Sequence, residues 1–282
     1  MLVQKVLITT DFSKYSAQLI HCIPELKSVG LKEVILVHVI DIRSPGGAAI
    51  AFKKYDEQML DQVKAEIEES GLQVKPIVAL GFPAAEVVHI AQQEKVDMIL
   101  IASHGKGFIK QRLLGSTAAD VIRLSSVPVM VEKYTEVDSE TVSVMCRIKF
   151  AKVLVPTDFS ACSERVLKLI KQSPGIIGEV LLVHVIERAE SLTDLEVIKA
   201  ERYQQLVEIK KELEAVGLKV DSFIELGNAP EHILNIAEDE AVTSIILSTR
   251  GEGFIKGLLV GSTADAVTRK SKRPVLLIPC RN

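Results

Sequence analysis

Short apolar runs rich in β-branched residues alternate along the chain with longer stretches in which apolar residues recur at helical spacing. This alternation is typical of parallel strands joined by crossover helices. In the first half it predicts strands at "KVLITT", "EVILVHVI", "QVKPIVAL", "VDMILIAS" and "VPVMVE". Helices are predicted between them at 13–27, 53–70, 83–94 and 116–125, and a flexible loop at 41–52.

The second half repeats this order of elements. Its predicted strands are "KVLVPT", "EVLLVHVI", "LKVDSFIE", "VTSIILST" and "RPVLLIP", with a long helix at 192–216. Strands as uniformly apolar as these need cover on both faces. The predicted fold class is therefore α/β, with two tandem open parallel five-stranded sheets that carry helices on both faces.

The two halves match closely enough to indicate a domain duplication. Residues 102–130 and 248–276 are identical at 15 of 29 positions, at a constant offset of 248 − 102 = 146. Repeats in solenoid proteins are much shorter, at about 20–50 residues. The segment between the halves follows neither period. We therefore predict domains at 1–133 and 150–282, joined by a linker at 134–149.

Composition narrows the range of partners. With 48% hydrophobic and 25% charged residues, the chain has the composition of a globular protein with a full core. An aromatic content of 4% and a net charge of −3 argue against binding to nucleic acid or to an anionic membrane. No apolar run is long enough to span a bilayer, and the N-terminus enters a strand without a signal-peptide pattern. We therefore expect a cytoplasmic protein.

Cysteine and histidine spacing gives no sign of a metal site. The four cysteines are widely spaced without a CxxC pair, so we expect reduced thiols at Cys22, Cys146, Cys162 and Cys280. The six histidines show no metal-ligand spacing. His38 and His184 repeat inside apolar strands, which favours hydrogen-bonded core residues.

The candidate chemistry centres on a glycine loop that occurs twice, as "ASHGKGFIKQRLLGST" at 102–117 and "STRGEGFIKGLLVGST" at 248–263. In each half the loop leaves the fourth predicted strand and ends at the start of a helix. In open α/β sheets, ligands bind at the carboxyl ends of the strands, and a helix N-terminus offers free amides and a positive dipole end to an anion. The glycines would let the backbone approach a phosphate, and the hydroxyls could donate to it.

The predicted phosphate-binding residues are Gly105, Gly115, Ser116 and Thr117, and in the second half Gly251, Gly261, Ser262 and Thr263. The alternative is a turn glycine followed by an ordinary helix cap. The duplicated spacing favours phosphate binding. The loops differ in charge, since Lys106, Lys110 and Arg112 give +3, whereas Arg250 and Lys256 less Glu252 give +1.

An aspartate follows the first predicted strand of each half, Asp11 in "TTDFS" and Asp158 in "PTDFS". A carboxylate at that edge can accept hydrogen bonds from ribose hydroxyls or from an adenine amino group. It could instead cap the helix that follows. Its place beside a phosphate-binding loop favours the nucleoside role.

Taken together, "TTDFS", "LVHVI", "GFPAAEVVHIA", "ASHGKGFIKQRLLGST" and "VPVMV" resemble one domain of the UspA-type universal stress protein family. The second half has a full matching set, so the resemblance covers nearly the whole chain. It implies adenine-nucleotide-binding domains with strand order 3-2-1-4-5 that pair through strand five, both within the chain as a pseudo-dimer and in self-association.

Nucleotide-binding members of that family resemble the pattern G-x2-G-x9-G-[ST], in which the loop holds phosphates, the strand-one aspartate meets ribose or base, and backbone after strand two meets adenine. Both halves depart from it at the first position, where a small residue replaces glycine. Carried across, the nucleotide-binding residues are Thr10, Asp11, Val39, Ala102, Ser103, His104, Gly105, Gly115, Ser116 and Thr117, and Thr157, Asp158, Val185, Ser248, Thr249, Arg250, Gly251, Gly261, Ser262 and Thr263.

Other nucleotide motifs do not fit. The segment "GKGFIK" lacks the last glycine of GxGxxG and follows strand four, and no GxxxxGK[ST] occurs. His104 could reach a phosphate, but Arg250 is its counterpart, so we expect no shared general base and no catalytic residue.

These patterns favour a sensor or regulatory protein that binds AMP or ATP. The sequence leaves open whether Mg²⁺ accompanies the nucleotide. The alternatives are a slow ATP hydrolase, and a dimerisation or scaffold module that binds no nucleotide. Hydrolysis normally needs a base and a metal or arginine. Beyond the loop no such set is repeated, so we expect weak ATP hydrolysis at most.

Overall fold

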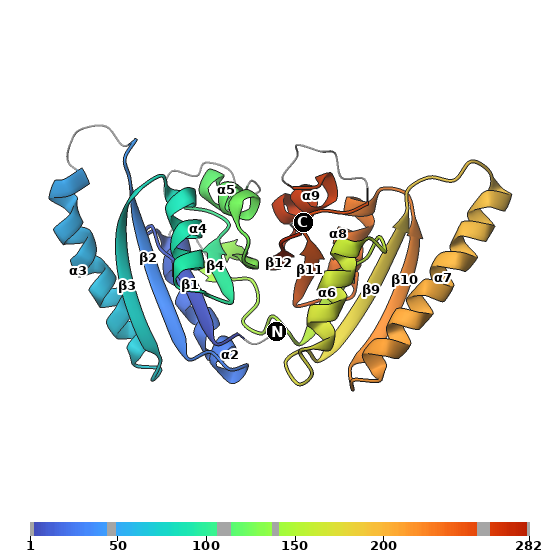
Figure 1. Ribbon diagram of the computed structural model, residues 1–282, viewed down its shortest axis with the longest axis horizontal. Coiled ribbons are helices and arrows are strands. Elements are labelled where there is room, and N and C mark those ends of the chain that lie inside the picture. Colours follow the sequence, from blue (N-terminus) through green and yellow to red (C-terminus); the bar gives the residue numbers. More distant parts are fainter. Residues whose placement is uncertain (1–2, 44–48, 106–113, 137–140, 253–259, 281–282) are drawn as a thin grey trace. The chain divides into compact units, whose positions relative to one another are not determined.

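The computed structural model describes residues 3–43, 49–105, 114–136, 141–252 and 260–280. The chain divides into two compact units, Leu2–Arg147 and Ile148–Cys280. Figure 1 shows the helices and strands of both units in the colours of the sequence.

In the N-terminal unit, five parallel strands lie in the order β3-β2-β1-β4-β5. Their bounds are β1 Lys5–Thr9, β2 Glu33–Asp41, β3 Gln73–Gly81, β4 Met98–Ala102 and β5 Val129–Glu132. The C-terminal unit has the same order, β10-β9-β8-β11-β12. Its strands are β8 Lys152–Pro156, β9 Glu179–Ile186, β10 Lys219–Leu226, β11 Ser244–Ser248 and β12 Val275–Ile278. The predicted fold class and the order 3-2-1-4-5 are confirmed.

Helices follow the strands as the periodicity predicts, with α3 beside β3 and α7 beside β10 (Figure 1). All five consecutive residues of β4 are buried, so both faces of this strand are covered. The helices of the N-terminal unit are α1 Lys14–Ala17, α2 Ile23–Ser28, α3 Ala49–Glu68, α4 Pro83–Gln93 and α5 Ser116–Leu124. Those of the C-terminal unit are α6 Ala161–Lys171, α7 Leu192–Glu214, α8 Ala229–Asp239 and α9 Ser262–Lys270.

The first predicted helix is the main departure in the N-terminal unit. In place of one helix at 13–27, the chain forms α1, a 3-10 helix η1 at Gln18–Cys22, and α2. Pro24 lies in the first turn of α2 and has no N–H to donate to the preceding turn. A continuous α-helix would lose that bond, so the segment is divided. At 41–52 the expected loop is shorter, because α3 already begins at Ala49.

Part of the predicted linker is ordered. Strands β6 (Tyr134–Glu136) and β7 (Val142–Val144) pair in antiparallel orientation. Val142 and Val144 are buried, and β7 contacts η1 of the same unit. The alternation of buried and partly exposed residues in "VSV" is the period of a half-buried strand.

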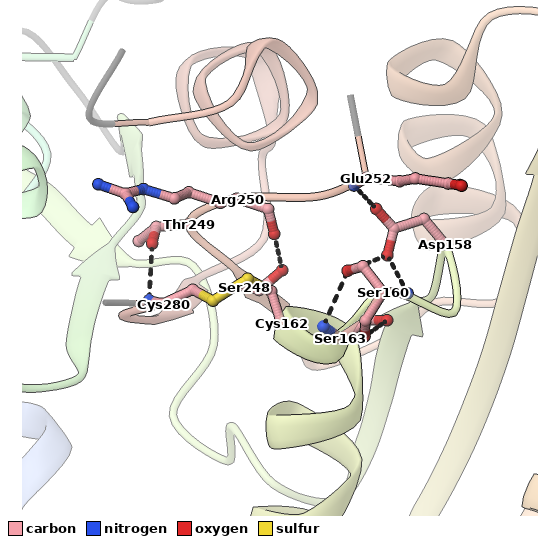
Figure 2. The surroundings of a disulfide bond; sticks show 9 residues. All are labelled: Asp158, Ser160, Cys162, Ser163, Ser248, Thr249, Arg250, Glu252 and Cys280. Carbon is pink, nitrogen blue, oxygen red and sulfur yellow. Dashed lines mark hydrogen bonds between the residues drawn. A yellow bond between two sulfur atoms is a disulfide. The ribbon is translucent and has the colours of Figure 1, made fainter. Parts of the chain in front are cut away.

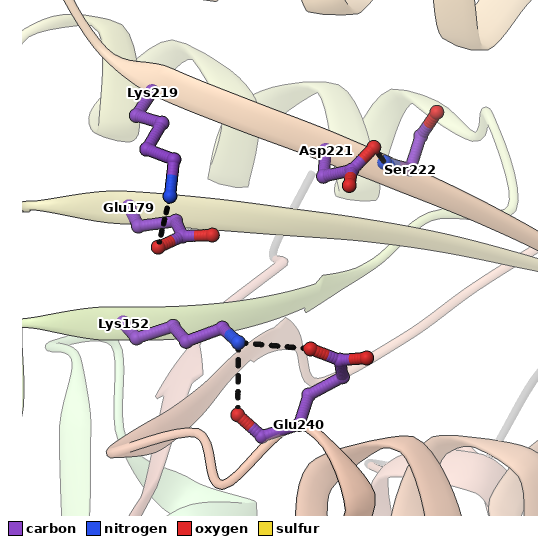
Figure 3. Close-up of polar contacts among 6 residues, drawn as sticks. All are labelled: Lys152, Glu179, Lys219, Asp221, Ser222 and Glu240. Carbon is purple, nitrogen blue, oxygen red and sulfur yellow. Dashed lines mark hydrogen bonds and ion pairs between the residues drawn. The ribbon is translucent and has the colours of Figure 1, made fainter.

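The amino-terminal edge of the C-terminal sheet carries paired charges (Figure 3). Lys219 Nζ lies 3.0 Å from Glu179 Oε2, and Lys152 Nζ lies 2.9 Å from Glu240 Oε2. These charges neutralise one another in pairs. The repeated polar turns lie at the opposite, carboxyl edge of each sheet.

Candidate functional site

Each candidate site begins at the turn that follows the first strand of its unit. Thr10 follows β1 and Thr157 follows β8, and both are buried. Each threonine hydroxyl accepts a hydrogen bond from the backbone N–H of the residue two positions on, at 3.0 Å from Phe12 and 3.1 Å from Phe159. Phe12 and Phe159 have φ values of 56° and 60°, a conformation that costs a bulky residue energy. The same strained turn therefore occurs in both units.

Two histidines fix these turns from the neighbouring strand. His38 Nδ1 on β2 lies 2.8 Å from Thr10 O, and His184 Nδ1 on β9 lies 2.9 Å from Thr157 O. A carbonyl oxygen only accepts, so Nδ1 carries the proton in both rings. The rings also contact Phe12 and Phe159 in a tilted arrangement, with centroids 4.4 Å and 4.7 Å apart. Both histidines are hydrogen-bonded as predicted; His184 is buried in the core, whereas His38 is partly exposed.

The aspartates lie inside the turns and are held by serines. Asp11 Oδ1 accepts from Ser13 N at 3.0 Å and from Ser16 Oγ at 2.8 Å. Asp158 Oδ1 accepts from Ser160 N at 3.1 Å and from Ser160 Oγ at 2.6 Å (Figure 2). The helix N-caps are the serines, Ser13 for α1 and Ser160 for α6. Each aspartate therefore holds the capping residue in place and is not the cap.

Asp158 is kept ionised by its surroundings. Burial works to raise its pKa, but hydrogen bonds from Ser160, from the backbone N–H of Glu252 and from Ser163 outweigh burial and hold the pKa below its ordinary value. A carboxylate that accepts several hydrogen bonds is stabilised in its charged form. At neutral pH the site therefore presents an anionic acceptor.

The first loop glycine of each unit packs directly on this carboxylate. A Cβ added to Gly105 would lie 2.5 Å from Asp11 Oδ2, and one added to Gly251 would lie still closer to Asp158 Oδ2. The next residue, Glu252, donates its backbone N–H to Asp158 Oδ2 at 2.6 Å (Figure 2). A Cβ here would require the aspartate side chain to move. The loop and the aspartate are thus brought together in both units.

The second loop glycine begins a helix in each unit. Gly115 is the N-cap of α5 and Gly261 that of α9. Gly115 N donates to Ser103 O and Gly261 N donates to Thr249 O, each at 2.8 Å, so the two ends of each loop meet.

The hydroxyls that follow these glycines lie in the first helical turn. Ser116, Thr117 and Ser262 are exposed, and Thr263 is partly exposed. The first turn of a helix has backbone amides without intrahelical acceptors and the positive end of the helix dipole. The predicted cradle therefore has amides and hydroxyls on one surface.

The residues that start each loop are mostly buried. Ala102 ends β4, and Ser103 is fully buried, with its backbone N–H bonded to Glu132 O. Ser103 Oγ lies 2.8 Å from His104 Nδ1, so this hydroxyl orients the imidazole.

In the second unit the start of the loop is fixed in a similar way. Ser248 ends β11, and its hydroxyl donates to the backbone oxygen of Arg250. Thr249 is buried and accepts from Cys280 N at 3.1 Å.

Val39 and Val185 are placed one residue beyond the histidines, on β2 and β9. Thr10 N donates to Val37 O, and Thr157 N donates to Val183 O. Residues two apart on a strand present their backbone groups to the same side. The backbone N–H and C=O groups of Val39 and Val185 therefore point toward the side of β1 and β8. They lie beyond the last residue of those strands, so β1 and β8 do not pair with them there.

The middle of each glycine loop, at 106–113 and 253–259, lies outside the described residues. This includes the predicted loop charges Lys106, Lys110, Arg112 and Lys256. Within the described residues, no group of three or more His, Cys, Asp or Glu side chains could hold a metal ion. In that same part of the chain, no helix combines the length and the apolar character needed to cross a membrane.

Segments 3–133 and 149–279 each match the model of the universal stress protein family. The chain belongs to the universal stress protein family. Universal stress protein MJ0577 of Methanocaldococcus jannaschii is 33% identical in an alignment of 153 residues, which covers 46% of this chain and 94% of that protein. Universal stress protein MJ0531 of the same organism is 31% identical in an alignment of 142 residues, which covers 47% of this chain and 83% of that protein.

A similar solved structure extends over the whole chain. The crystal structure of a universal stress protein from Archaeoglobus fulgidus DSM 4304 matches with a TM-score of 0.73 and 27% identity, and covers 98% of this chain and 96% of that one. The tandem arrangement of two universal stress domains is therefore shared with that protein.

Sequence reasoning missed several residues of this universal stress protein that contact the site. Phe12 and Phe159 were visible in the repeated "TDF" but had no assigned role. Asp56 and Arg202 occupy equivalent positions on α3 and α7, at the same offset of 146, and carry opposite charge.

Because of this difference in charge, the surroundings of the two histidines also differ. Asp56 Oδ2 lies 3.6 Å from His38 Nε2, whereas the Arg202 guanidinium lies 5.4 Å from the ring centroid of Phe159. Burial lowers the pKa of His184, the bond to Thr157 O opposes this, and the Arg202 charge lowers the pKa further. The second site therefore keeps its histidine neutral.

The prediction of four reduced thiols is wrong for one pair. Cys162 and Cys280 form a disulfide, whereas Cys22 and Cys146 are not disulfide-bonded. The two bonded residues are 118 positions apart, so no local motif indicates the pair. They meet because the carboxyl edge of the sheet brings the start of α6 beside the segment after β12, with Cα atoms 5.5 Å apart.

Proposed function

We propose that each half of the chain binds an adenine nucleotide, AMP or ATP, and that the protein acts in the cytoplasm as a nucleotide-dependent stress sensor or regulatory protein. The observation that carries this proposal is the same juxtaposition in both units: a glycine with no room for a Cβ against an aspartate, followed by a glycine that begins a helix.

The phosphates are assigned to the start of α5 and of α9. The exposed hydroxyls of Ser116 and Ser262 and the amides of the first helical turn are donors suited to an anion. Ala102 and Ser248, where the nucleotide-binding pattern has glycine, are small residues that end β4 and β11.

The ribose is assigned to the aspartates. The lowered pKa of Asp158 keeps an anionic acceptor beside the loop, and hydrogen bonds to ionised groups are the stronger ones. On binding, a ribose hydroxyl would take the place of Glu252 N on Oδ2. The adenine is assigned to the backbone of Val39 and Val185, which faces the side where β1 and β8 have ended.

Binding without catalysis is the favoured activity. Position 104 is histidine in one unit, and its counterpart in the other unit is arginine, so the two sites share no general base there. Mg²⁺ would be bound through the nucleotide phosphates, because the described residues hold no metal-ligand cluster.

Isothermal titration calorimetry with AMP and ATP, with and without Mg²⁺, tests the proposal, and chromatography of the bound nucleotide tests hydrolysis. Two sites and unchanged ATP support nucleotide sensing. Steady release of ADP would establish a hydrolase, and no binding of either nucleotide would leave the scaffold function.

Single-site variants assign the binding events. Gly115→Val and Gly261→Val should each reduce the number of sites from two to one, because a branched side chain would occupy the approach to the helix N-terminus. An added Cβ would lie 3.3 Å from Ser103 O at Gly115 and 3.6 Å from Thr249 O at Gly261, so thermal unfolding must be measured beside binding. An unchanged number of sites in both variants contradicts the assignment.

We also propose that the two halves pair through strand five, because "VPVMV" and "RPVLLIP" would otherwise each leave an apolar sheet edge open. Limited trypsin cleavage after the exposed Arg147, where the N-terminal unit ends, followed by size-exclusion chromatography tests this. Halves that stay together after cleavage support the pairing, and two independent monomeric halves contradict it.

A further inference from the structure

The Cys162–Cys280 disulfide joins the two sides of the C-terminal candidate site (Figure 2). Cys162 lies in the first turn of α6, between Ser160 and Ser163. Ser160 Oγ accepts from Ser163 N at 3.3 Å and donates to Asp158 Oδ1 at 2.6 Å. One end of the disulfide is therefore part of the turn that holds the aspartate.

The other end of the disulfide is bonded to the glycine loop. Cys280 N donates to Thr249 Oγ1 at 3.1 Å, and Thr249 O accepts from Gly261 N at 2.8 Å. Thr249 is itself a loop residue, and Gly261 begins α9. The disulfide, together with the hydrogen bond from Cys280 N to Thr249, thus links the aspartate turn to the start of the phosphate loop.

The N-terminal unit has no cysteine at either of these positions. Tyr15 follows Asp11 by four residues, as Cys162 follows Asp158, and Tyr134 lies two residues after β5, as Cys280 lies two residues after β12. The two tyrosine rings meet edge to face with centroids 5.3 Å apart. The same two points of the fold are in contact in both units, but only the C-terminal contact can be broken by reduction.

We propose that the Cys162–Cys280 disulfide is a redox modification site whose state controls nucleotide affinity in the C-terminal half. This inference rests on the proposed nucleotide binding. The reactant is a dithiol of the kind that keeps cytoplasmic thiols reduced, and disulfides in that compartment are usually transient and redox-sensing.

The exchange proceeds in two balanced steps. A thiolate of the dithiol attacks the sulfur of Cys162, which is the more exposed of the pair, and the sulfur of Cys280 leaves as a thiolate that takes up a proton. The second thiol of the reductant then attacks the mixed disulfide and releases Cys162. Two thiols form in the protein, and the dithiol becomes a disulfide, so two electrons and two protons are transferred.

Reduction should weaken nucleotide binding because it removes a covalent constraint on the relative position of Asp158 and the loop. A preformed site binds more tightly than one that must be ordered on binding. We expect the C-terminal affinity to fall by roughly five- to 150-fold, the range typical of coupling between two sites. The N-terminal affinity should stay the same.

The test compares the full chain oxidised, after treatment with dithiothreitol, and as the Cys162→Ser/Cys280→Ser variant, by calorimetry with ATP. Gly115→Val and Gly261→Val in each background assign the two sites, and alkylation with mass spectrometry counts the thiols. Cys146→Ser is the matched control, because Cys146 is a partly exposed cysteine outside the disulfide, and this variant should retain the full response to reductant.

A fall in affinity confined to the C-terminal site supports the proposal. Equal affinities in the oxidised and reduced states, with the broken disulfide verified by alkylation, overturn it and leave the proposed function intact. So does the finding of four alkylated thiols in the oxidised protein. Absence of nucleotide binding in every state overturns both.

A reciprocal measurement avoids reliance on the serine variant, which could fail to fold. If the disulfide favours nucleotide binding, bound nucleotide must favour the disulfide by the same factor. The quantity to measure is the ratio of reduced to oxidised dithiothreitol at which half of the wild-type protein has lost its disulfide. Saturating ATP should raise this ratio by the same factor. An unchanged ratio overturns the proposal.

Discussion

Replacing Gly251 with alanine tests the contact between the glycine loop and the aspartate. The added Cβ would lie closer to Asp158 Oδ2 than the 2.5 Å that separates a Cβ at Gly105 from Asp11, and real Cβ atoms essentially never come within 3.0 Å. The carboxylate would have to turn away and give up its 2.6 Å bond from Glu252 N.

Hydrogen bonds to charged groups contribute about 1.5–3 kcal/mol. A loss of this size corresponds to a fall in Tm of about 5–15 °C for the unfolding of a domain of this size. Thermal denaturation followed by circular dichroism measures the effect. Gly261→Ala is the matched control, because its Cβ would lie at an ordinary 3.6 Å from Thr249 O.

A double-mutant cycle with Asp158→Ala separates the clash from other effects. Without the carboxylate, Gly251→Ala should cost close to nothing, which gives a coupling free energy of about 1.5–3 kcal/mol between the two positions. If Gly251→Ala destabilises no more than Gly261→Ala, or if the two changes are additive, the packing of the loop on the aspartate does not determine glycine at 251.

Three further predictions concern charge. Arg202→Gln should raise the pKa of His184 towards its ordinary value, because the guanidinium charge adds to the lowering of the pKa by burial. NMR titration measures this pKa, with Lys199→Gln as a control on the same helix. An unchanged pKa in Arg202→Gln would contradict the prediction. The free energy of unfolding of the C-terminal half should fall as the pH drops below 6.5 and again below 3.8, the ordinary pKa values of His184 and Asp158. Both pKa values are lowered in the folded state, so the unfolded chain binds more protons as the pH falls. Denaturant unfolding at about pH 8 and about pH 5 measures the loss of stability that is due to His184. Greater stability at the lower pH would refute the prediction. The N-terminal site should favour ATP over AMP more strongly than the C-terminal site, because its loop carries a charge of +3 and the other loop a charge of +1. Calorimetry on the single-site variants at low salt measures the ratio of ATP to AMP affinity at each site. Equal ratios at the two sites would exclude loop charge as the cause.

The strands and the position of the loops could be predicted because each depends on local pattern. The strand order depends on pairing between distant segments, and it was predicted only from the resemblance to the universal stress protein family. Uniform apolar runs mark buried parallel strands, and the duplicated glycine spacing marks the turn after the fourth strand in both units. The helix bounds were less predictable. The division of the helix at 13–27 depends on Pro24. The missing N–H of proline is a local effect, but whether a helix continues past it depends on the packing around it.

The contacts that distinguish the two sites could not be predicted, because they join residues far apart in the chain. Asp56 on α3 lies beside His38, and Arg202 on α7 lies over the ring of Phe159. The sequence of neither helix indicates these contacts. Cys162 and Cys280 were judged by local spacing, which carries no information on a pair formed by the return of the last strand to the sheet edge.

The disulfide also stabilises the C-terminal unit against unfolding. It closes a loop of 118 residues, almost the whole C-terminal unit, and in the chain-entropy model a loop of this length stabilises the folded state by about 4–5 kcal/mol. The edge-to-face tyrosine pair at the equivalent positions contributes about 0.5–1.5 kcal/mol beyond its buried area. On heating, a reductant should therefore lower the melting temperature of the C-terminal unit and leave that of the N-terminal unit unchanged.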